Sequence, residues 1–233
     1  MKTYEKRLKK SSYPGRGIVI GITPDNKNIV QIYWIMGRST NSRNRIFEMD
    51  GDFMRTKAYD EALLTDPSLV IYYPMKNYSS SHIVTNGDQT DTIYKHLTIG
   101  KTFEDALEKR KFEPDPPNFT PRISGIADIK TGGYKLSILK TIDNNEHFEQ
   151  KCFYSYGNFI SGIGHCITTY TDDGNPLPSF GGEPYTVKLF DDIDVNLKTF
   201  RDYLDSENRV STAVKFINVK TGKATVKIID ENV

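Results

Sequence analysis

Cysteine, long apolar runs and an excess of one charge are all scarce in this sequence of 233 residues. Its two cysteines, Cys152 and Cys166, are too few for a disulfide framework and lack the paired spacing of a structural zinc site, so we predict packed thiols. No stretch approaches the roughly 18 apolar residues that span a bilayer. The segment Met1–Lys6 also lacks the apolar core of a secretory signal. We therefore expect a cytoplasmic protein without a membrane partner.

The charges are almost balanced, with 31 Lys plus Arg against 30 Asp plus Glu. A net charge of +1 creates no broad field toward DNA, RNA or anionic lipid, so nucleic acid is not an expected partner. Any bound anion must be held by a local cluster of cations. Residues 1–12 are rich in Lys and Arg and are predicted to form a basic, solvated N-terminal extension, with a basic docking arm as the alternative.

Tyrosine, phenylalanine and β-branched residues are plentiful and fall in short runs between Gly, Asn and Asp turns, a pattern typical of antiparallel sheet. Pro24-Asp25-Asn26 supplies turn chemistry for a first hairpin. The predicted strands are Gly17–Thr23, Asn28–Met36, Arg45–Met49, Phe53–Tyr59, Leu69–Tyr73, His82–Thr85, Ile123–Ile129, Tyr134–Ile142, Phe148–Tyr156, His165–Tyr170, Tyr185–Leu189, Val210–Val219 and Ala224–Ile229.

Helical periodicity is clear in two places. Thr102–Lys111 begins with Thr102 and Asp105 as a capping pair, and Val195–Leu204 follows a group of aspartates suited to a helix N-terminus. Asp91–Leu97 is a shorter third candidate. Since the helices fall between groups of strands, we predict stacked sheets with helices outside, an α+β fold.

Arginine and small hydroxyl residues gather in the loop Gly37–Arg45, which offers Arg38, Ser39 and Arg45. Phosphate is bound well by planar guanidinium groups together with hydroxyl or backbone donors. At this stage a phosphate-binding loop and an ordinary solvated basic loop both remain open.

Two further polar segments each have a functional and a structural interpretation. In Thr85–Ile93 the Asn86-Gly87 pair permits a sharp turn with positive φ. Either Thr90 or Asp91 caps the following helix, or the turn exposes Asn86 and Asp91 to a ligand. In Glu113–Ile123 several prolines stiffen a loop that carries carboxylates and Arg122, which suits either acid/base chemistry or a salt-bridged anchor.

Two tempting motifs are rejected. Gly15, Gly17 and Gly21 superficially match a dinucleotide fingerprint, but a hairpin follows them where that fingerprint needs a helix. His165 beside Cys166 suggests a thiol nucleophile, yet neighbours on a strand face opposite sides and form a poor catalytic couple.

Taken together, several segments resemble the archaeal-type IMP cyclohydrolase family and its bacterial relatives over about residues 13–185. The most specific is Asn-Gly-x-x-Thr-Asp-Thr-Ile, from Asn86 to Ile93. The sequence departs from the family in extra residues between Arg38-Ser39 and Asn44-Arg45 and in a longer loop after Tyr170. The other matching segments are Tyr13-x-Gly15-Arg16, Arg38-Ser39, Asn44-Arg45, Thr120-Pro121-Arg122-Ile123 and Thr169-Tyr170.

The resemblance implies a four-layer α-β-β-α sandwich similar to the N-terminal-nucleophile hydrolases, with mostly antiparallel sheets and no N-terminal nucleophile. We expect one such domain over residues 13–233. It also implies an IMP cyclohydrolase, which closes the ring of 5-formamidoimidazole-4-carboxamide ribonucleotide to inosine monophosphate in purine biosynthesis. No metal or other cofactor is required for this ring closure.

The resemblance also suggests roles for residues in this chain. Glu113 is the candidate proton-transfer group, with Tyr13 and Tyr170 as neighbouring donors. Arg122, Asn86 and Asp91 are expected to orient the base and the formyl group. The candidate substrate-binding residues are Arg16, Arg38, Ser39, Arg45, Gly87, Thr90, Thr120 and Tyr170.

Two other functions remain as alternatives. One is a related nucleotide-binding protein or amide-processing enzyme of the same fold that acts on another purine-like nucleotide, and the other is a scaffold without activity. The partner in the favoured case is a small purine ribonucleotide. A homo-oligomer is possible because exposed sheet edges can pair.

Overall fold

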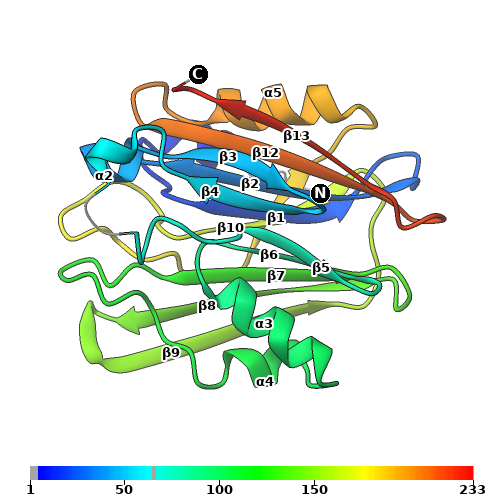
Figure 1. Cartoon of the computed structure of the whole chain (residues 1–233), viewed down its shortest axis with the longest axis horizontal. Helices are drawn as coiled ribbons and strands as arrows, with labels where there is room; N and C mark the ends of the chain where they lie inside the picture. Colours follow the sequence, from blue (N-terminus) through cyan, green and yellow to red (C-terminus); the bar gives the residue numbers. More distant parts are fainter. Residues whose placement is uncertain (1–4, 65–66, 233) are drawn as a thin grey trace.

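Two antiparallel sheets form the body of the protein in a computed structural model that describes residues 5–64 and 67–232 (Figure 1). The six-stranded sheet has the order β11-β10-β1-β2-β12-β13. Its strands are β1 (Gly17–Ile22), β2 (Asn28–Met36), β10 (Ile163–Thr168), β11 (Tyr185–Lys188), β12 (Arg209–Asn218) and β13 (Ala224–Asp230).

The seven-stranded sheet follows chain order from β3 to β9. Its strands are β3 (Ile46–Asp50), β4 (Phe53–Lys57), β5 (Met75–Tyr78), β6 (Ser81–Thr85), β7 (Arg122–Asp128), β8 (Gly133–Ile142) and β9 (Asn145–Tyr156). The helices are α1 (Glu5–Lys10), α2 (Thr40–Arg43), α3 (Gln89–Thr98), α4 (Phe103–Leu107) and α5 (Ile193–Tyr203), with a short 3-10 turn at Glu61–Leu63. The predicted α+β class with mostly antiparallel sheets is confirmed.

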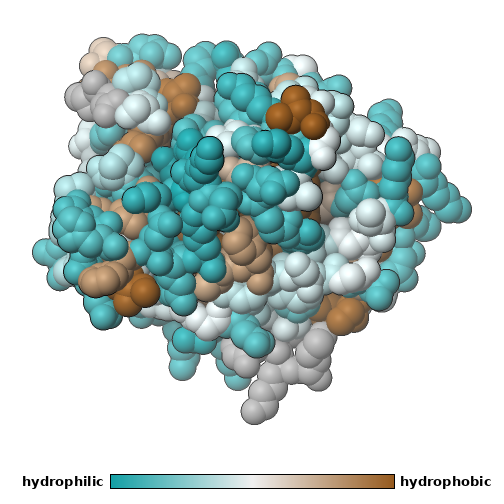
Figure 2. Space-filling model, turned by 90° about the horizontal axis from the view of Figure 1, so that it is seen from below, coloured by the Kyte–Doolittle hydropathy of each residue, from teal (hydrophilic) through white to brown (hydrophobic). Residues whose placement is uncertain are grey.

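The sheets pack face to face, with helices outside them. Contacts between β1 and β7 and between β2 and β6 join the sheets, and Gln31 Nε2 donates a buried hydrogen bond to the carbonyl of His82 at 2.9 Å. Helix α5 packs on β12 and β13, while α3 packs on β5, β6 and β7 (Figure 1). Seen from the side of α3 and α4, the surface is mostly hydrophilic with scattered apolar residues (Figure 2). The likeness to N-terminal-nucleophile hydrolases stays a prediction.

The β1–β2 hairpin forms where predicted, and its residues explain why. Asn26 takes a positive φ of 58° in the turn, and the Thr23 hydroxyl donates to Asp25 at 2.7 Å. All six residues of β1 are buried, since β1 lies between β10 and β2 inside its sheet and packs on β7 of the second sheet. This central hairpin ends at Met36, so it carries the following arginine loop to one end of the sheets.

The helix-start signals are also confirmed for two helices. Thr102 and Asp105 form a capping box on α4, and Asp192 caps α5 by accepting from the backbone amides of Asp194 and Val195. The third candidate helix is present as α3 and begins earlier, at Gln89. Among the described residues, no helix is long and apolar enough to cross a membrane.

Three expectations about secondary structure are wrong. Leu69–Tyr73 is not a strand, although it is rich in β-branched and aromatic residues, because it bends back on itself: the amide of Ile71 donates to the carbonyl of Pro67 at 2.9 Å. The strand at this position is β5, after Pro74. The loop Gly37–Arg45 contains the unexpected helical turn α2.

The N-terminal segment is the third correction. Residues 1–4 lie outside the described part of the chain, but residues 5–10 form α1 and are not simply solvated. Leu8 is only 2% exposed in the core, and Arg7 lies 4.9 Å from the centre of the Tyr185 ring. A single apolar residue in a basic run is a weak sequence signal for a buried helix. Leu8 is buried only because the rest of the protein offers a surface on which α1 packs. The domain boundary at residue 13 stays a prediction.

Candidate functional site

A polar cavity of about 270 Å³ opens at the end of the sheets where β1 begins and β2 ends. Segments far apart in the sequence meet there: the entry to β1, the arginine loop, the proline-rich loop and the chain after β10. The cavity is lined by Tyr13, Gly15, Arg16, Met36, Arg38, Ser39, Ser42, Arg45, Asp115, Asn118, Thr120, Thr169, Tyr170 and Leu177.

Arg45 is a buried cation in the cavity wall, with a relative exposure of 1%. Its Nε donates to the carbonyl of Ser42 at 2.9 Å, while its Nη1 has no hydrogen-bond partner among the described residues. Burial lowers the pKa of Arg45, and the neighbouring positive charge of Arg16 lowers it further. A buried guanidinium with a spare donor is costly in an empty protein and well suited to receive an anion.

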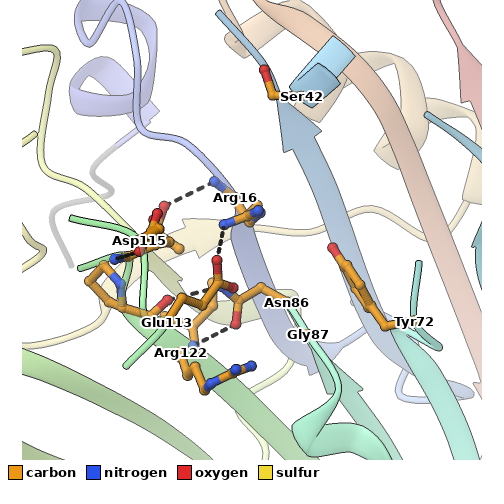
Figure 3. Close-up of polar contacts among 12 residues, drawn as sticks. Arg16, Ser42, Tyr72, Asn86, Gly87, Glu113, Asp115 and Arg122 are labelled. Atoms are coloured by element: carbon orange, nitrogen blue, oxygen red, sulfur yellow. Dashed lines mark hydrogen bonds and ion pairs between the residues drawn. The ribbon is translucent and has the colours of Figure 1, made fainter. Parts of the chain in front are cut away.

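Glu113 faces the cavity-lining Arg16 from behind the cavity wall (Figure 3). The carboxylate Oε2 lies 3.3 Å from Arg16 Nη1, and Glu113 is only 2% exposed. Its backbone amide donates to the carbonyl of Thr120 at 2.8 Å, which fixes the start of the proline-rich loop. Burial raises the pKa of Glu113, although Arg16 and then Arg122 act in the opposite direction. A carboxyl group with a raised pKa can hold and release a proton closer to neutral pH.

A pair of tyrosines adds hydroxyl groups near the same arginines. The hydroxyls of Tyr33 and Tyr72 are 2.7 Å apart and buried. Burial raises the pKa of Tyr33, then Tyr72 raises it and Arg16 lowers it. Figure 3 shows Tyr72 on a segment separate from those that carry Arg16 and Glu113. No sequence pattern indicates this pair, because Tyr72 lies in a run whose composition is that of an ordinary strand.

The proline-rich loop is held by a chain of hydrogen bonds that reaches the aromatic wall. Asp115 accepts from the Thr120 amide at 2.6 Å and from its hydroxyl. The Thr120 hydroxyl lies 2.6 Å from that of Tyr170, whose ring stacks on Tyr13 with centroids 6.1 Å apart. Gly15 fits beneath this wall because a Cβ there would lie 2.2 Å from the Thr169 hydroxyl oxygen. Asp115, like the wall residues Asn118 and Leu177, was not among the expected site residues.

The Asn86-Gly87 turn lies beside Glu113 and is strongly structural. Asn86 is fully buried, donates to the carbonyl of Pro121 at 2.9 Å and accepts from the amide of Ile123 at 2.8 Å. Gly87 allows Arg122 to approach closely, since a Cβ would lie 2.7 Å from Arg122 Nη1 and the guanidinium would have to shift. Gly87 does not adopt the positive φ that an Asn-Gly pair permits.

Arg122 is buried at the start of β7 and is shared by two side chains of the same turn. Its Nη1 donates to Gln89 Oε1 at 2.9 Å and lies 2.7 Å from Asp88 Oδ1. Figure 3 places Arg122, Asn86 and Gly87 beside the Arg16–Glu113 pair. These residues therefore form a polar cluster behind the cavity wall.

Thr90 and Asp91 do not cap α3, and neither lines the cavity. The Thr90 hydroxyl lies 2.6 Å from that of Thr85, inside the turn. Asp91 pairs with Lys76 at 2.6 Å and does not line the cavity. The N-cap of α3 is Asp88, and in the described structure no side-chain bond caps it. The prediction that Thr90 or Asp91 caps this helix was wrong because the helix begins earlier.

Arg38 and Ser39 line the outer part of the cavity and already have protein partners. The Ser39 hydroxyl caps α2 by accepting from the amide of Ser42 at 3.2 Å. Arg38 lies 4.8 Å from the centre of the Tyr13 ring and forms an ion pair with Asp173. The arginine loop is therefore an ordered part of the cavity wall.

Among the described residues, no group of three or more His, Cys, Asp or Glu side chains could together hold a metal ion. The two cysteines lie outside the cavity lining, with Cys166 in the core. His165 lies on the other face of β10 and stacks on Tyr156 with centroids 4.1 Å apart. The expectation that His165 and Cys166 do not form a couple is confirmed.

Comparison with known proteins bears on the whole of this region. No curated protein sequence matches the chain significantly. The family of IMP cyclohydrolase-like proteins matches residues 13–222, which include the cavity-lining residues and every strand of both sheets except β13. Since this match covers most of its length, the chain belongs to the IMP cyclohydrolase-like protein family.

Proposed function

We propose that this protein is an IMP cyclohydrolase, with the cavity at the end of the sheets as its active site. The family implies a purine nucleotide as substrate. One observation carries the proposal: a buried arginine with a spare donor, Arg45, lines the same cavity as Arg16, which contacts the buried carboxyl of Glu113. The spare donor of Arg45 suits an anionic phosphate, and the buried carboxyl of Glu113 suits proton transfer.

The reaction requires positioning more than strong reagents. The carboxamide nitrogen of the substrate attacks the formyl carbon on the neighbouring substituent, forming a C–N bond and a tetrahedral centre with a hydroxyl group. Loss of a nitrogen proton and of that hydroxyl, which leaves with a proton as water, completes the pyrimidine ring. Holding the two groups close and coplanar supplies a large part of the rate enhancement, since an intramolecular reaction in the right geometry avoids much of the entropic cost.

The residues of the cavity fit these needs. Arg45 and Arg38 bind the ribose phosphate, with hydroxyl donors from the α2 turn. Arg16 stabilises the developing oxyanion, a role for which a guanidinium held in place by Glu113 is preorganised. Glu113 delivers a proton to the departing hydroxyl, which the raised pKa favours. Tyr13, Thr120 and Tyr170 shape the wall and supply hydroxyl donors.

Residues behind the wall act on the geometry and not on the substrate. Arg122, Asn86 and Gly87 hold the turn that supports Glu113, so we assign them positioning roles. Asp91 and Thr90 have no role in the proposed chemistry, because Asp91 pairs with Lys76 and the Thr90 hydroxyl pairs with that of Thr85. We also propose that the layered sheets are those of an N-terminal-nucleophile-type sandwich, used without an N-terminal nucleophile.

The proposal is tested by incubating purified protein with the formylated ribonucleotide and identifying inosine monophosphate by chromatography. Formation of this product by the parent protein, with a large loss in Glu113→Gln, is expected. Binding of inosine monophosphate without turnover would favour the alternative, a related protein that acts on another purine-like nucleotide. A parent protein that neither binds nor forms inosine monophosphate would contradict both.

A further inference from the structure

The chain between β10 and β11 closes one side of the cavity with residues 171–179, called the strap from here on. Its two ends are joined, because the amide of Thr171 donates to the carbonyl of Pro178 at 3.0 Å. Leu177 lines the cavity, and its amide donates to Asn118 Oδ1 at 3.0 Å. The strap is therefore tied to the proline-rich loop across the cavity mouth.

Asp173 in the strap forms an ion pair with the guanidinium of Arg38. The same guanidinium nitrogen donates to the carbonyl of Gly174 at 3.3 Å. Arg38 thus gives its Nη1 to the strap, unlike Arg45, whose Nη1 has no partner among the described residues. The pair is partly open to solvent, with side-chain exposures of 39% for Arg38 and 47% for Asp173.

The strap has other attachments that do not depend on Arg38. Asp172 accepts from the hydroxyl of Ser11 and from the amide of Ser12, both at 3.1 Å. Together with the Leu177–Asn118 bond, these contacts hold the strap on both sides of Asp173. The Arg38–Asp173 pair can therefore open without loss of the strap from the cavity wall.

From this arrangement, and resting on the proposed function, we propose that Asp173 is a specificity-determining residue that competes with the ligand's phosphate for Arg38. An anion that enters the cavity meets the Asp173 charge and must take Arg38 from it. The resulting penalty applies to charged ligands and grows with their charge, whereas a neutral nucleoside does not incur it. Asp173 thereby limits how tightly phosphate-bearing ligands are held.

Calorimetric titration of parent and Asp173→Asn proteins with inosine monophosphate, inorganic phosphate and inosine tests this proposal. Asparagine keeps the size of the side chain and removes its charge. Because the pair is half exposed, we expect inosine monophosphate and phosphate to bind about two- to five-fold more tightly to Asp173→Asn. Inosine binding should not change, and the gain should shrink as salt is added. Asp172→Asn is the matched control, since Asp172 carries the same charge in the strap but contacts Ser11 and Ser12.

Unchanged or weaker binding of inosine monophosphate by Asp173→Asn would overturn the proposal, because Asp173 would then position Arg38 for the ligand. An equal gain for inosine, or an equal gain in Asp172→Asn, would overturn it as well. So would a parent protein that binds none of the three ligands. Turnover is not measured in these titrations, so a missing cyclohydrolase activity alongside the expected binding shifts would count against the proposed function alone.

Discussion

Replacing Arg45 by methionine should stabilise the empty protein and weaken its binding of phosphate-bearing ligands. Arg45 is 1% exposed, and among the described residues its guanidinium forms one hydrogen bond, from Nε to the carbonyl of Ser42. Methionine fills a similar length without a charge. Replacing poorly compensated buried charge by apolar groups can stabilise a protein by about 1–4 kcal/mol, and the lost hydrogen bond costs about 1 kcal/mol. We therefore expect the free energy of unfolding to rise by about 1–2 kcal/mol, which corresponds to a melting temperature higher by roughly 2–8 °C.

The effect on binding should have the opposite sign. A charge-assisted hydrogen bond contributes about 1.5–3 kcal/mol, so inosine monophosphate should bind about 10- to 100-fold more weakly to Arg45→Met. KM should rise more than kcat falls, because the phosphate contact is the same in the ground state and in the transition state. Thermal denaturation and calorimetric titration of the same samples measure both effects.

Arg43→Met is the matched control for this experiment. Arg43 belongs to the same loop but donates to the carbonyls of Gly37 and Glu207 and does not line the cavity. Its replacement should leave ligand affinity within about two-fold of the parent, as for other surface changes. If Arg45→Met were less stable than the parent and bound the nucleotide normally, Arg45 would be a structural residue and the reasoning would be refuted.

Three further predictions concern other buried groups. Glu113→Gln should lower kcat on the order of 10²–10⁴-fold with little change in product affinity, and a fully active variant would remove Glu113 from the mechanism. Cys152→Ala and Cys166→Ala should each keep turnover within a few-fold of the parent, since burial raises the pKa of the Cys166 thiol and keeps it protonated; a folded but inactive variant would reopen a covalent route. Burial lowers the pKa of Lys215 from 10.5 to about 8, so unfolding takes up a proton between these two pH values and the free energy of unfolding should rise with pH there. Lys215→Met should then be more stable at pH 7 by about 1–3 kcal/mol, with the gain fading above pH 10 in denaturant titrations; a gain independent of pH would contradict this.

Much of the fold follows from local signals in the sequence. Runs rich in Ile, Val, Tyr and Trp on either side of a Pro-Asp-Asn turn predicted the β1–β2 hairpin, and a capping pair predicted the start of α4 at Thr102. These signals succeed because hairpins and caps depend on neighbours in the chain. Helix α1 and strand β5 were missed, since Leu8 is buried by a distant surface and Met75 pairs in a short strand between others.

The site was harder to predict than the fold. Arg38 and Arg45 share one loop and both line the cavity, although the sequence left a phosphate-binding loop and a solvated basic loop equally open. Tyr72 and Asp173 come from segments far from that loop, and only the topology of the two sheets brings them to the arginines. Asp91 belongs to the Asn-Gly-x-x-Thr-Asp-Thr-Ile motif, yet its side chain pairs with Lys76 and does not line the cavity.

Conversion of the formylated ribonucleotide to inosine monophosphate, followed by absorbance with purified protein after thorough chelation, tests the central claim most directly. We expect one inosine monophosphate for each substrate consumed, at a rate that chelation does not change, because the proposed ring closure uses only groups of the protein and the substrate. Absence of the product, or turnover that is lost on chelation and restored by zinc or magnesium, would contradict the account.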